Sequence, residues 1–350
     1  MVDEVAFLKE LVSIASPSGQ EDAVAEYLLA KMTTLGYGAH RDKAGNVVGQ
    51  LGPSAAEGNI VLLGHMDTVP GAIAVRQEGD LLYGRGTVDA KGPLAAFVLA
   101  AARVAGRQER RCLTVIGAVG EEGRSPGAHY LASTMESPEC VLIGEPSGWQ
   151  GITLGYKGVL SVAYRLAAPS RHMASGQPTP AEAAVTFWNG LAAYAANHNQ
   201  GRGWRFDSLD PVLQAVNTFD DGLEQGVEMN VALRLPPELD LAALRRQLDS
   251  WSMGAELIFP YQELAYVAQK NTAPVRALLR AIRREGGQPR FKLKTGTSDM
   301  NVVGAAWDCP IVAYGPGDSA LDHTPDEHIE VAEYRKSIDV LAHALELLAV

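Results

Sequence analysis

Residues 60–70 read Ile-Val-Leu-Leu-Gly-His-Met-Asp-Thr-Val-Pro, and they predict a short buried strand that ends in a polar turn. The apolar run is too short for a helix and begins with β-branched residues. Because alternate side chains of a strand share a face, His65 and Asp67 can point the same way. An acid there can hold one ring nitrogen of the histidine and leave the other free for a metal ion. Taken alone, such a pair is more often a core histidine beside a turn aspartate.

Length and composition limit the classes of protein to consider. A chain of 350 residues predicts two domains. Its net charge of -11 argues against general nucleic-acid binding, and no apolar run reaches the roughly 18 residues of a membrane span. The acidic start is unlike a signal peptide, and three cysteines in apolar surroundings suggest buried thiols. These features predict a cytoplasmic protein with no membrane or nucleic-acid partner.

The domain order follows from the patterns along the chain. Strand and helix patterns alternate up to about residue 155, which predicts an α/β layer structure with a mostly parallel sheet. Ser18 and Glu21 form a predicted capping box for the second helix. From about residue 158, alternating strands and one long helix flank a Gly- and Asp-rich passage, which suggests a small α+β unit. The first pattern then returns, so a catalytic domain of 1–157 and 265–350 is predicted to carry an insertion at 158–264.

Five short segments place an acid or a histidine directly after a predicted strand or in a Gly-rich loop. Loops at the carboxyl ends of strands in an open α/β sheet converge, so we expect these side chains to meet. Together they offer two histidines and several carboxylates, a set that suits two zinc-like ions with a further carboxylate as general base. The segments are Gly64–Asp67, Gly84–Gly92, Gly117–Gly123, Ile143–Ser147 and Asp322–Glu327.

The order of these motifs resembles the co-catalytic zinc family that includes acetylornithine deacetylase, succinyl-diaminopimelate desuccinylase, glutamate carboxypeptidase and aminoacylase. The resemblance spans essentially the whole chain and implies a zinc-exopeptidase-like catalytic domain. It also implies two Zn²⁺ ions, which Co²⁺ can replace, and a cis peptide bond between Asp89 and Ala90. The implied roles are Asp67 orienting His65, Glu121 as base, and His65, Asp89, Glu122, Glu145 and His323 as metal ligands, with Asp89 bridging.

The inserted unit resembles the lid or dimerisation domain of the same family. The resemblance therefore implies a homodimer in which His172 stabilises the oxyanion in the partner's active site. Met173 departs from the small residue that the family usually has there. Arg234 matches an arginine that holds a substrate carboxylate, and a planar guanidinium suits that task. Thr297, Ser298 and Asn301 lie in the other predicted substrate-binding segment, where Asn301 replaces the arginine of the desuccinylase pattern.

Within the family, the Thr-Gly-Thr-Ser-Asp-Met-Asn segment at 295–301 resembles the branch of lysine and arginine biosynthesis. Enzymes of that branch release lysine or ornithine from an acidic amino-group carrier protein, LysW. The net charge of -11 fits an acidic partner poorly, unless an arginine cluster at residues 276–290 forms a local basic face. An acetylornithine-type deacetylase or small-peptide carboxypeptidase acting on free small molecules is the alternative. A second alternative is a metal-binding module without catalytic activity. The presence of every predicted ligand and of the predicted base Glu121 argues against this alternative.

Overall fold

The computed structural model of the chain describes residues 3–53, 56–107 and 110–348. The chain divides into two compact units. Unit 1 comprises Met1–Gly155, Ala268–Leu293 and Ser298–Val350, and unit 2 comprises Tyr156–Val267 and Lys294–Thr297. The predicted insertion at 158–264 falls within unit 2.

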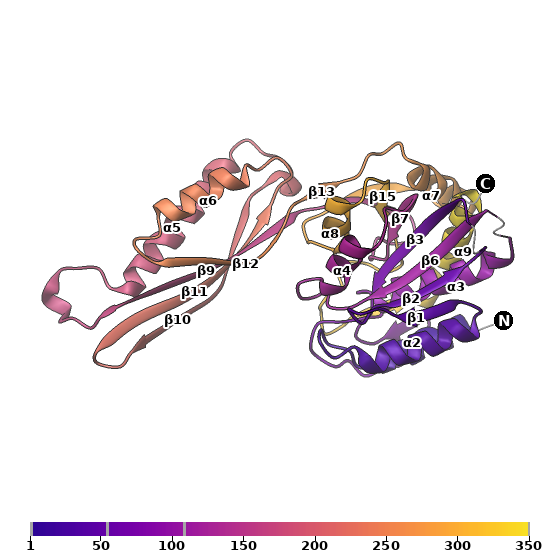
Figure 1. Cartoon of the computed structure of the whole chain (residues 1–350), viewed down its shortest axis with the longest axis horizontal. Helices are drawn as coiled ribbons and strands as arrows, with labels where there is room; N and C mark the ends of the chain where they lie inside the picture. Colours follow the sequence, from indigo (N-terminus) through magenta and orange to yellow (C-terminus); the bar gives the residue numbers. More distant parts are fainter. Residues whose placement is uncertain (1–2, 54–55, 108–109, 349–350) are drawn as a thin grey trace. The chain divides into compact units, whose positions relative to one another are not determined.

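A mixed β-sheet forms the centre of unit 1 (Figure 1). Its strands follow the order β1-β2-β6-β3-β7-β15-β8, and β14 pairs with β8. Their bounds are β1 Gly38–Arg41, β2 Val47–Leu51, β3 Gly58–His65, β6 Arg111–Ala118, β7 Cys140–Ile143, β8 Gly151–Tyr156, β14 Arg290–Lys294 and β15 Ile311–Ala313.

The prediction of a mostly parallel sheet holds only for the middle of this sheet. Strand β3 runs parallel to β6 and β7, and β7 runs parallel to β15. The pairs β1–β2, β2–β6 and β15–β8 are antiparallel. The turn between β1 and β2 spans residues 42–46, and so short a connection can join only antiparallel strands.

Helices pack against this sheet and against one another. Helix α3, rich in alanine and almost wholly buried, contacts β3 and β6 and packs on α1 and α9. Helices α4 and α8, neither of which was predicted, pack together. A smaller sheet in the order β16-β5-β4 completes the unit. The bounds are α1 Glu4–Ser13, α2 Asp22–Thr34, α3 Lys91–Val104, α4 Pro126–Thr134, α7 Ala273–Arg284, α8 Asp299–Ala306, α9 Val331–Leu348, β4 Arg76–Glu78, β5 Leu81–Tyr83 and β16 His328–Glu330.

Two local predictions in unit 1 are wrong. Helix α2 begins at Asp22 without a side-chain cap, so Ser18 and Glu21 form no capping box. The Ser18 hydroxyl instead donates to Asp67 Oδ2 at 2.6 Å, a contact that joins residues 49 positions apart. Of the cysteines, only Cys140 is buried, whereas Cys112 and Cys309 are partly exposed; all three are free thiols.

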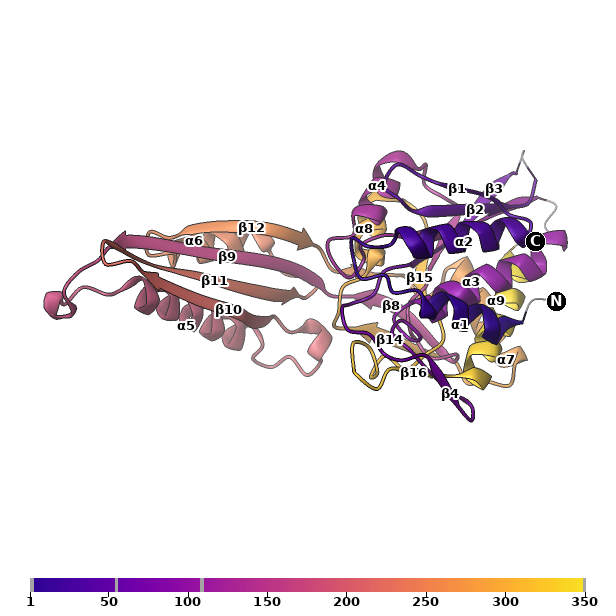
Figure 2. The same ribbon diagram turned by 90° about the horizontal axis from the view of Figure 1, so that it is seen from below.

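Unit 2 is a four-stranded antiparallel sheet in the order β10-β11-β9-β12, with α5 and α6 on one face (Figures 1 and 2). Its core includes Tyr164 and Phe187, whose rings lie 4.9 Å apart. Most side chains of β10 are exposed, so the strand lacks an alternating pattern, and no strand was predicted in this Gly- and Asp-rich passage. The bounds are β9 Gly158–Pro169, α5 Pro180–His198, β10 Asp210–Asp220, β11 Glu224–Leu235, α6 Leu241–Ser250, β12 Glu256–Glu263 and β13 Tyr266–Val267. No helix in the described ranges of the chain is long and apolar enough to cross a membrane.

Candidate metal centre

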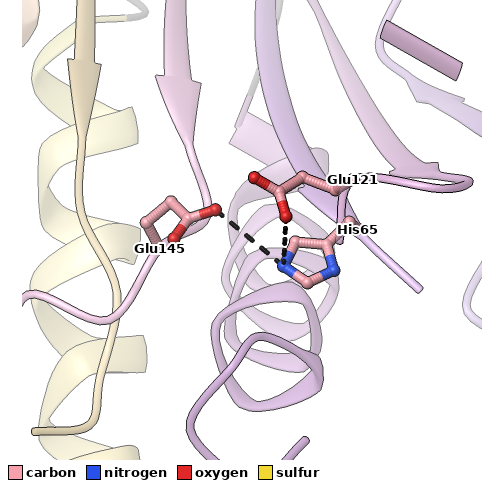
Figure 3. Close-up of side chains that lie close together, drawn as sticks. All are labelled: His65, Glu121 and Glu145. Atoms are coloured by element: carbon pink, nitrogen blue, oxygen red, sulfur yellow. Dashed lines mark ion pairs between the residues drawn. The ribbon is translucent and has the colours of Figure 1, made fainter. Parts of the chain in front are cut away.

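The carboxyl ends of three neighbouring parallel strands bring the candidate residues together. His65 ends β3 opposite Ala118, which ends β6, and Glu121 follows three residues later. Glu145 follows the end of β7, whose Ile143 lies opposite Leu63 of β3. Parallel strands present their carboxyl ends at one edge, so all three side chains point into the same space (Figure 3).

A glycine makes this close approach possible. A Cβ atom at Gly144 would lie 2.9 Å from Cε2 of Phe97 and 3.2 Å from Cα of Gly64. Any larger residue would therefore push the Glu145 loop away from β3 and from the His65 ring.

The buried His65 ring is surrounded by carboxylates. Its Nε2 lies 3.9 Å from both Glu121 Oε2 and Glu145 Oε1 (Figure 3). The same nitrogen lies 3.3 Å from Asp89 Oδ1. Although buried, Nε2 makes no hydrogen bond of normal geometry with the part of the chain that the structure describes. A buried nitrogen in this state, facing several carboxylate oxygens, is what a metal ligand requires.

A second histidine approaches from the opposite side of Asp89. His323 Nε2 lies 3.0 Å from Asp89 Oδ2 and 3.0 Å from Glu122 Oε1. One oxygen of Asp89 thus faces His65 and the other faces His323, which is the arrangement of a bridging carboxylate. The Asp89–Ala90 peptide bond is cis, as the family resemblance implies.

Two overlapping groups of side chains have the geometry to hold a cation. His65, Glu121 and Glu145 form one group, and His65, Asp89 and Glu122 form the other; within each, the potential ligand atoms lie within 4.8 Å of one another. Imidazole and carboxylate together suit zinc and related ions. Glu121, which was predicted to be the base, belongs to the first group.

The pKa values of the histidines and glutamates in this centre are shifted because many ionisable side chains are buried close together. Burial, with the neighbouring carboxylates, raises the pKa of Glu121 well above its usual value, and burial raises the pKa of Glu122. Hydrogen bonds to Asp89 and Glu122 raise the pKa of His323 to about 10. Burial opposes the charged form of His65, yet the nearby carboxylates of Asp67, Asp89 and Glu121 outweigh it and raise its pKa. So many buried carboxylates are costly unless a cation compensates them.

The Asp67 carboxylate anchors the acidic loop more closely than it contacts His65. The nearest partner of His65 Nδ1 is the backbone carbonyl of Asp67 at 2.9 Å, whereas the carboxylate lies at 3.4 Å. Asp67 Oδ1 accepts the backbone N–H of Glu121 and Oδ2 that of Glu122, both at 3.0 Å. Asp67 therefore fixes the backbone of the two adjacent glutamates, and its predicted role in orienting His65 falls partly to its own carbonyl group.

Two acidic residues of this region were missed from the sequence. Asp299, at the start of α8, is buried, and burial raises its pKa to about 6. Its charge is one of those that raise the pKa of Glu121. Glu327 is fully buried and binds the loop that carries Asp89. The motif Asp322–Glu327 could have drawn attention to Glu327, but its partners lie about 240 residues away in sequence.

Three predicted site residues belong to unit 2. His172 is exposed, and its Nδ1 accepts the backbone N–H of Ala174 at 3.2 Å. Arg234 donates from Nη1 to Thr297 Oγ1 at 3.0 Å, and the Thr297 hydroxyl donates to the carbonyl of Lys157 at 3.2 Å. Thr297 thus holds the guanidinium of Arg234 in place.

Ser298 and Asn301 are buried and form the capping box of α8. The Ser298 hydroxyl accepts the N–H of Met300, and Asn301 Oδ1 accepts the N–H of Ser298 at 3.0 Å. These polar groups are engaged in starting the helix, and a contact of either residue with substrate stays a prediction.

A family model matches most of the chain. Residues 61–347 match the model of peptidase family M20/M25/M40, and the chain belongs to this family. It is accordingly a hydrolase of amide bonds and a member of a metallopeptidase family.

Individual proteins of known name or structure resemble the chain over nearly its whole length. The chain is 43% identical to the LysW-lysine hydrolase of Deinococcus radiodurans, over 97% of this chain and 96% of the relative. It is 28% identical to the LysW-lysine/LysW-ornithine hydrolase of Sulfurisphaera tokodaii, over 97% and 94%. Among solved structures, an M20 family metallo-carboxypeptidase from Sulfolobus solfataricus matches with a TM-score of 0.80 at 17% identity, over 100% of both chains. Human carnosine dipeptidase 1 matches with a TM-score of 0.76 at 16% identity, over 99% and 96%.

Proposed function

We propose that the chain is a two-zinc amidohydrolase that releases lysine or ornithine from a LysW-type carrier protein. The observation that carries this proposal is the Asp89 carboxylate lying between His65 and His323, with Glu121, Glu122 and Glu145 around it. The names of the relatives supply the substrate. His65 and Glu145 would hold one ion, Glu122 and His323 the other, and Asp89 both.

The chain's own residues account for the proton transfers. When bound, the two ions would polarise the scissile carbonyl and make a water easier to deprotonate. Glu121 takes the proton of the attacking water and returns it to the leaving amine nitrogen as the carbon–nitrogen bond breaks. The products are a free amino acid and a carboxylate on the carrier. The raised pKa of Glu121 suits a group that must both accept and donate a proton.

Residues 158–264 would serve as the lid and dimerisation domain. Strand β10 is an edge strand, and Val212, Leu213, Val216 and Phe219 are each more than two-fifths exposed. An edge strand can form backbone hydrogen bonds with another strand, and a second copy of the chain would cover this edge. In His172 the Nδ1 atom already accepts a hydrogen bond, so the neutral ring carries its proton on Nε2. That N–H would donate to the oxyanion in the partner's site, while Arg234 binds the substrate carboxylate.

A basic face on unit 1 would receive the acidic carrier. Arg276, Arg280, Arg283 and Arg284 are exposed on α7, opposite its buried apolar side, and Arg290 is exposed on β14. None of the five makes an ion pair within the described ranges. The connection between α7 and β14 also lies against the segment after Glu145, since Gln288 N–H donates to Gln150 Oε1 at 2.6 Å. Charge complementarity of this kind favours association with an acidic partner.

The substrate proposal is tested by offering carrier-linked lysine and free acetylornithine side by side. We expect a much higher kcat/KM for the carrier-linked substrate. Preference for acetylornithine would instead identify a deacetylase of free small molecules, and hydrolysis of neither would favour a non-catalytic module.

The docking face is tested with the double variant Arg280→Glu and Arg284→Glu. We expect KM to rise for the carrier-linked substrate but not for a small acyl-lysine. The matched control is Arg246→Glu, an exposed arginine of α6. Equal effects of the test and control variants would contradict docking on α7.

A further inference from the structure

One buried carboxylate lies behind the candidate metal centre without facing it. Glu327 is fully buried, and its Oε1 accepts the backbone N–H groups of Gly86 at 2.9 Å, Val88 at 2.9 Å and Asp89 at 3.1 Å. Its Oε2 accepts Nη1 of Arg85 at 2.8 Å. Because both oxygens are engaged, Glu327 is not available as a metal ligand.

These bonds join the two loops that approach the centre from outside the main sheet. Strands β5 and β16 pair antiparallel, with Tyr83 opposite His328. Beyond this pair, the chain after β5 leads to Asp89, and the chain before β16 contains His323. The Gly84 N–H donates to the Glu327 carbonyl at 3.3 Å, and the side chain of Glu327 then holds the following turn.

The backbone of the Asp89 loop is shaped to surround this carboxylate. Gly86 has a φ of +87°, which other residues adopt only at a cost, and its N–H points toward Oε1 together with those of Val88 and Asp89. Successive N–H groups that converge in this way form an anion-binding concavity. Arg85 adds a bond to the Thr324 carbonyl at 3.2 Å, next to His323. The loop bearing Asp89 and the loop bearing His323 are therefore held by the same carboxylate.

We propose that Glu327 is a positioning residue of the metal centre, which sets the separation of Asp89 and His323 and so the affinity for divalent ions. This inference rests on the proposed ligand roles of those two residues. Asp67 does the equivalent for the loop of Glu121 and Glu122, since it accepts the N–H groups of both residues. Non-ligand groups that orient ligands in this way typically change metal affinity or activity by about 10–100-fold when replaced.

The test measures metal binding by the full-length, metal-free chain. Co²⁺ is titrated into the wild type, Glu327→Gln and Glu327→Ala, and binding is followed by visible absorption, which reports coordination geometry. The thermal unfolding of each metal-free protein is measured in parallel. The matched control is Glu330→Gln, an exposed glutamate of β16, the strand that begins directly after Glu327.

We expect Glu327→Ala to weaken Co²⁺ binding by about 10–100-fold and to alter the spectrum, because three backbone N–H groups lose their acceptor. Glu327→Gln keeps an acceptor for these N–H groups but places an amide against Arg85. Its loss of Co²⁺ affinity should therefore be smaller than that of Glu327→Ala, yet measurable. If the alanine variant does not fold, the glutamine variant alone decides the outcome. Wild-type affinity and spectrum in a folded glutamine variant would overturn the proposal, as would an equal loss in Glu330→Gln. Because no substrate is involved, failure here is distinguishable from failure of the substrate assay.

Discussion

The acidic residues of the centre fall into two groups, according to whether their oxygens face a histidine ring or accept backbone N–H groups. Four carboxylates face the imidazole rings, whereas Asp67 and Glu327 accept backbone N–H groups of the loops that carry three of those four, Glu121, Glu122 and Asp89. Asp299 belongs to neither set, since it adds buried negative charge beside Glu121. The four are Asp89, Glu121, Glu122 and Glu145.

The isosteric variant Asp299→Asn tests this electrostatic coupling. A neighbouring negative charge disfavours ionisation of Glu121, so removing the charge should lower the pKa of Glu121. A general base must be deprotonated, and the acidic limb of the kcat/KM profile should therefore move toward lower pH. The profile is measured on metal-loaded enzyme. An acidic limb that stays in place, or moves to higher pH, would contradict the coupling.

For individual residues, the sequence predicts which side chains meet at the centre better than it predicts the residues that hold their loops. His65 and Glu145 could be recognised because His65 ends a buried strand and Glu145 follows one in the parallel middle of the sheet, where loops converge. Ser18 was assigned to a local capping box because its spacing to Glu21 fits one, but its hydroxyl binds Asp67. Local spacing carries no information on a partner 49 or 240 residues away, so the contacts of Ser18 and Glu327 emerge only from the fold.

Among the elements, helix α8 begins beside the centre, because its first residue, Asp299, lies near Glu121. Its capping box of Ser298 and Asn301 fixes the first turn, in which Asp299 lies. Helix α5 also begins with a capping box, formed by Thr179 and Glu182. The two helices therefore provide a matched pair.

Ser298→Ala should lower the free energy of unfolding by about 0.5–2 kcal/mol, because the first turn loses its cap. Thr179→Ala in α5 should cost a similar amount. Both are measured by denaturant unfolding, and KM is determined for each variant. A rise in KM for Ser298→Ala alone would identify the predicted substrate contact. Unchanged stability in Ser298→Ala would show that the cap contributes nothing.

Elements were predictable where burial leaves a pattern. The alternating strand at 160–167 and the long helix at 180–199 appear as β9 and α5, because one face of each is buried. Strand β10 is exposed along most of its length, and its place is set by pairing with β11 instead. The antiparallel flanks of the main sheet likewise depend on short turns and pairings that alternation of strand and helix does not reveal.

For the whole molecule, the proposed site is composite, with His172 supplied by a second copy of the chain. Loss of one oxyanion donor typically lowers kcat by about 10²–10³-fold. Mixing His172→Ala with Glu121→Ala chains should restore activity, because each heterodimer contains one intact site. Each variant mixed only with itself serves as the control. No recovery in a verified heterodimer would mean that His172 does not act across a dimer.

The proposed centre holds two ions and is served by a base that is not a ligand, and Glu121→Gln tests this arrangement most directly. Metal content per chain and turnover are measured on the same preparation of wild type and variant. We predict two ions bound in both proteins, with turnover of the variant lower by about 10²–10⁴-fold. If an ion is lost together with the activity, Glu121 is a ligand, and the base must be another residue.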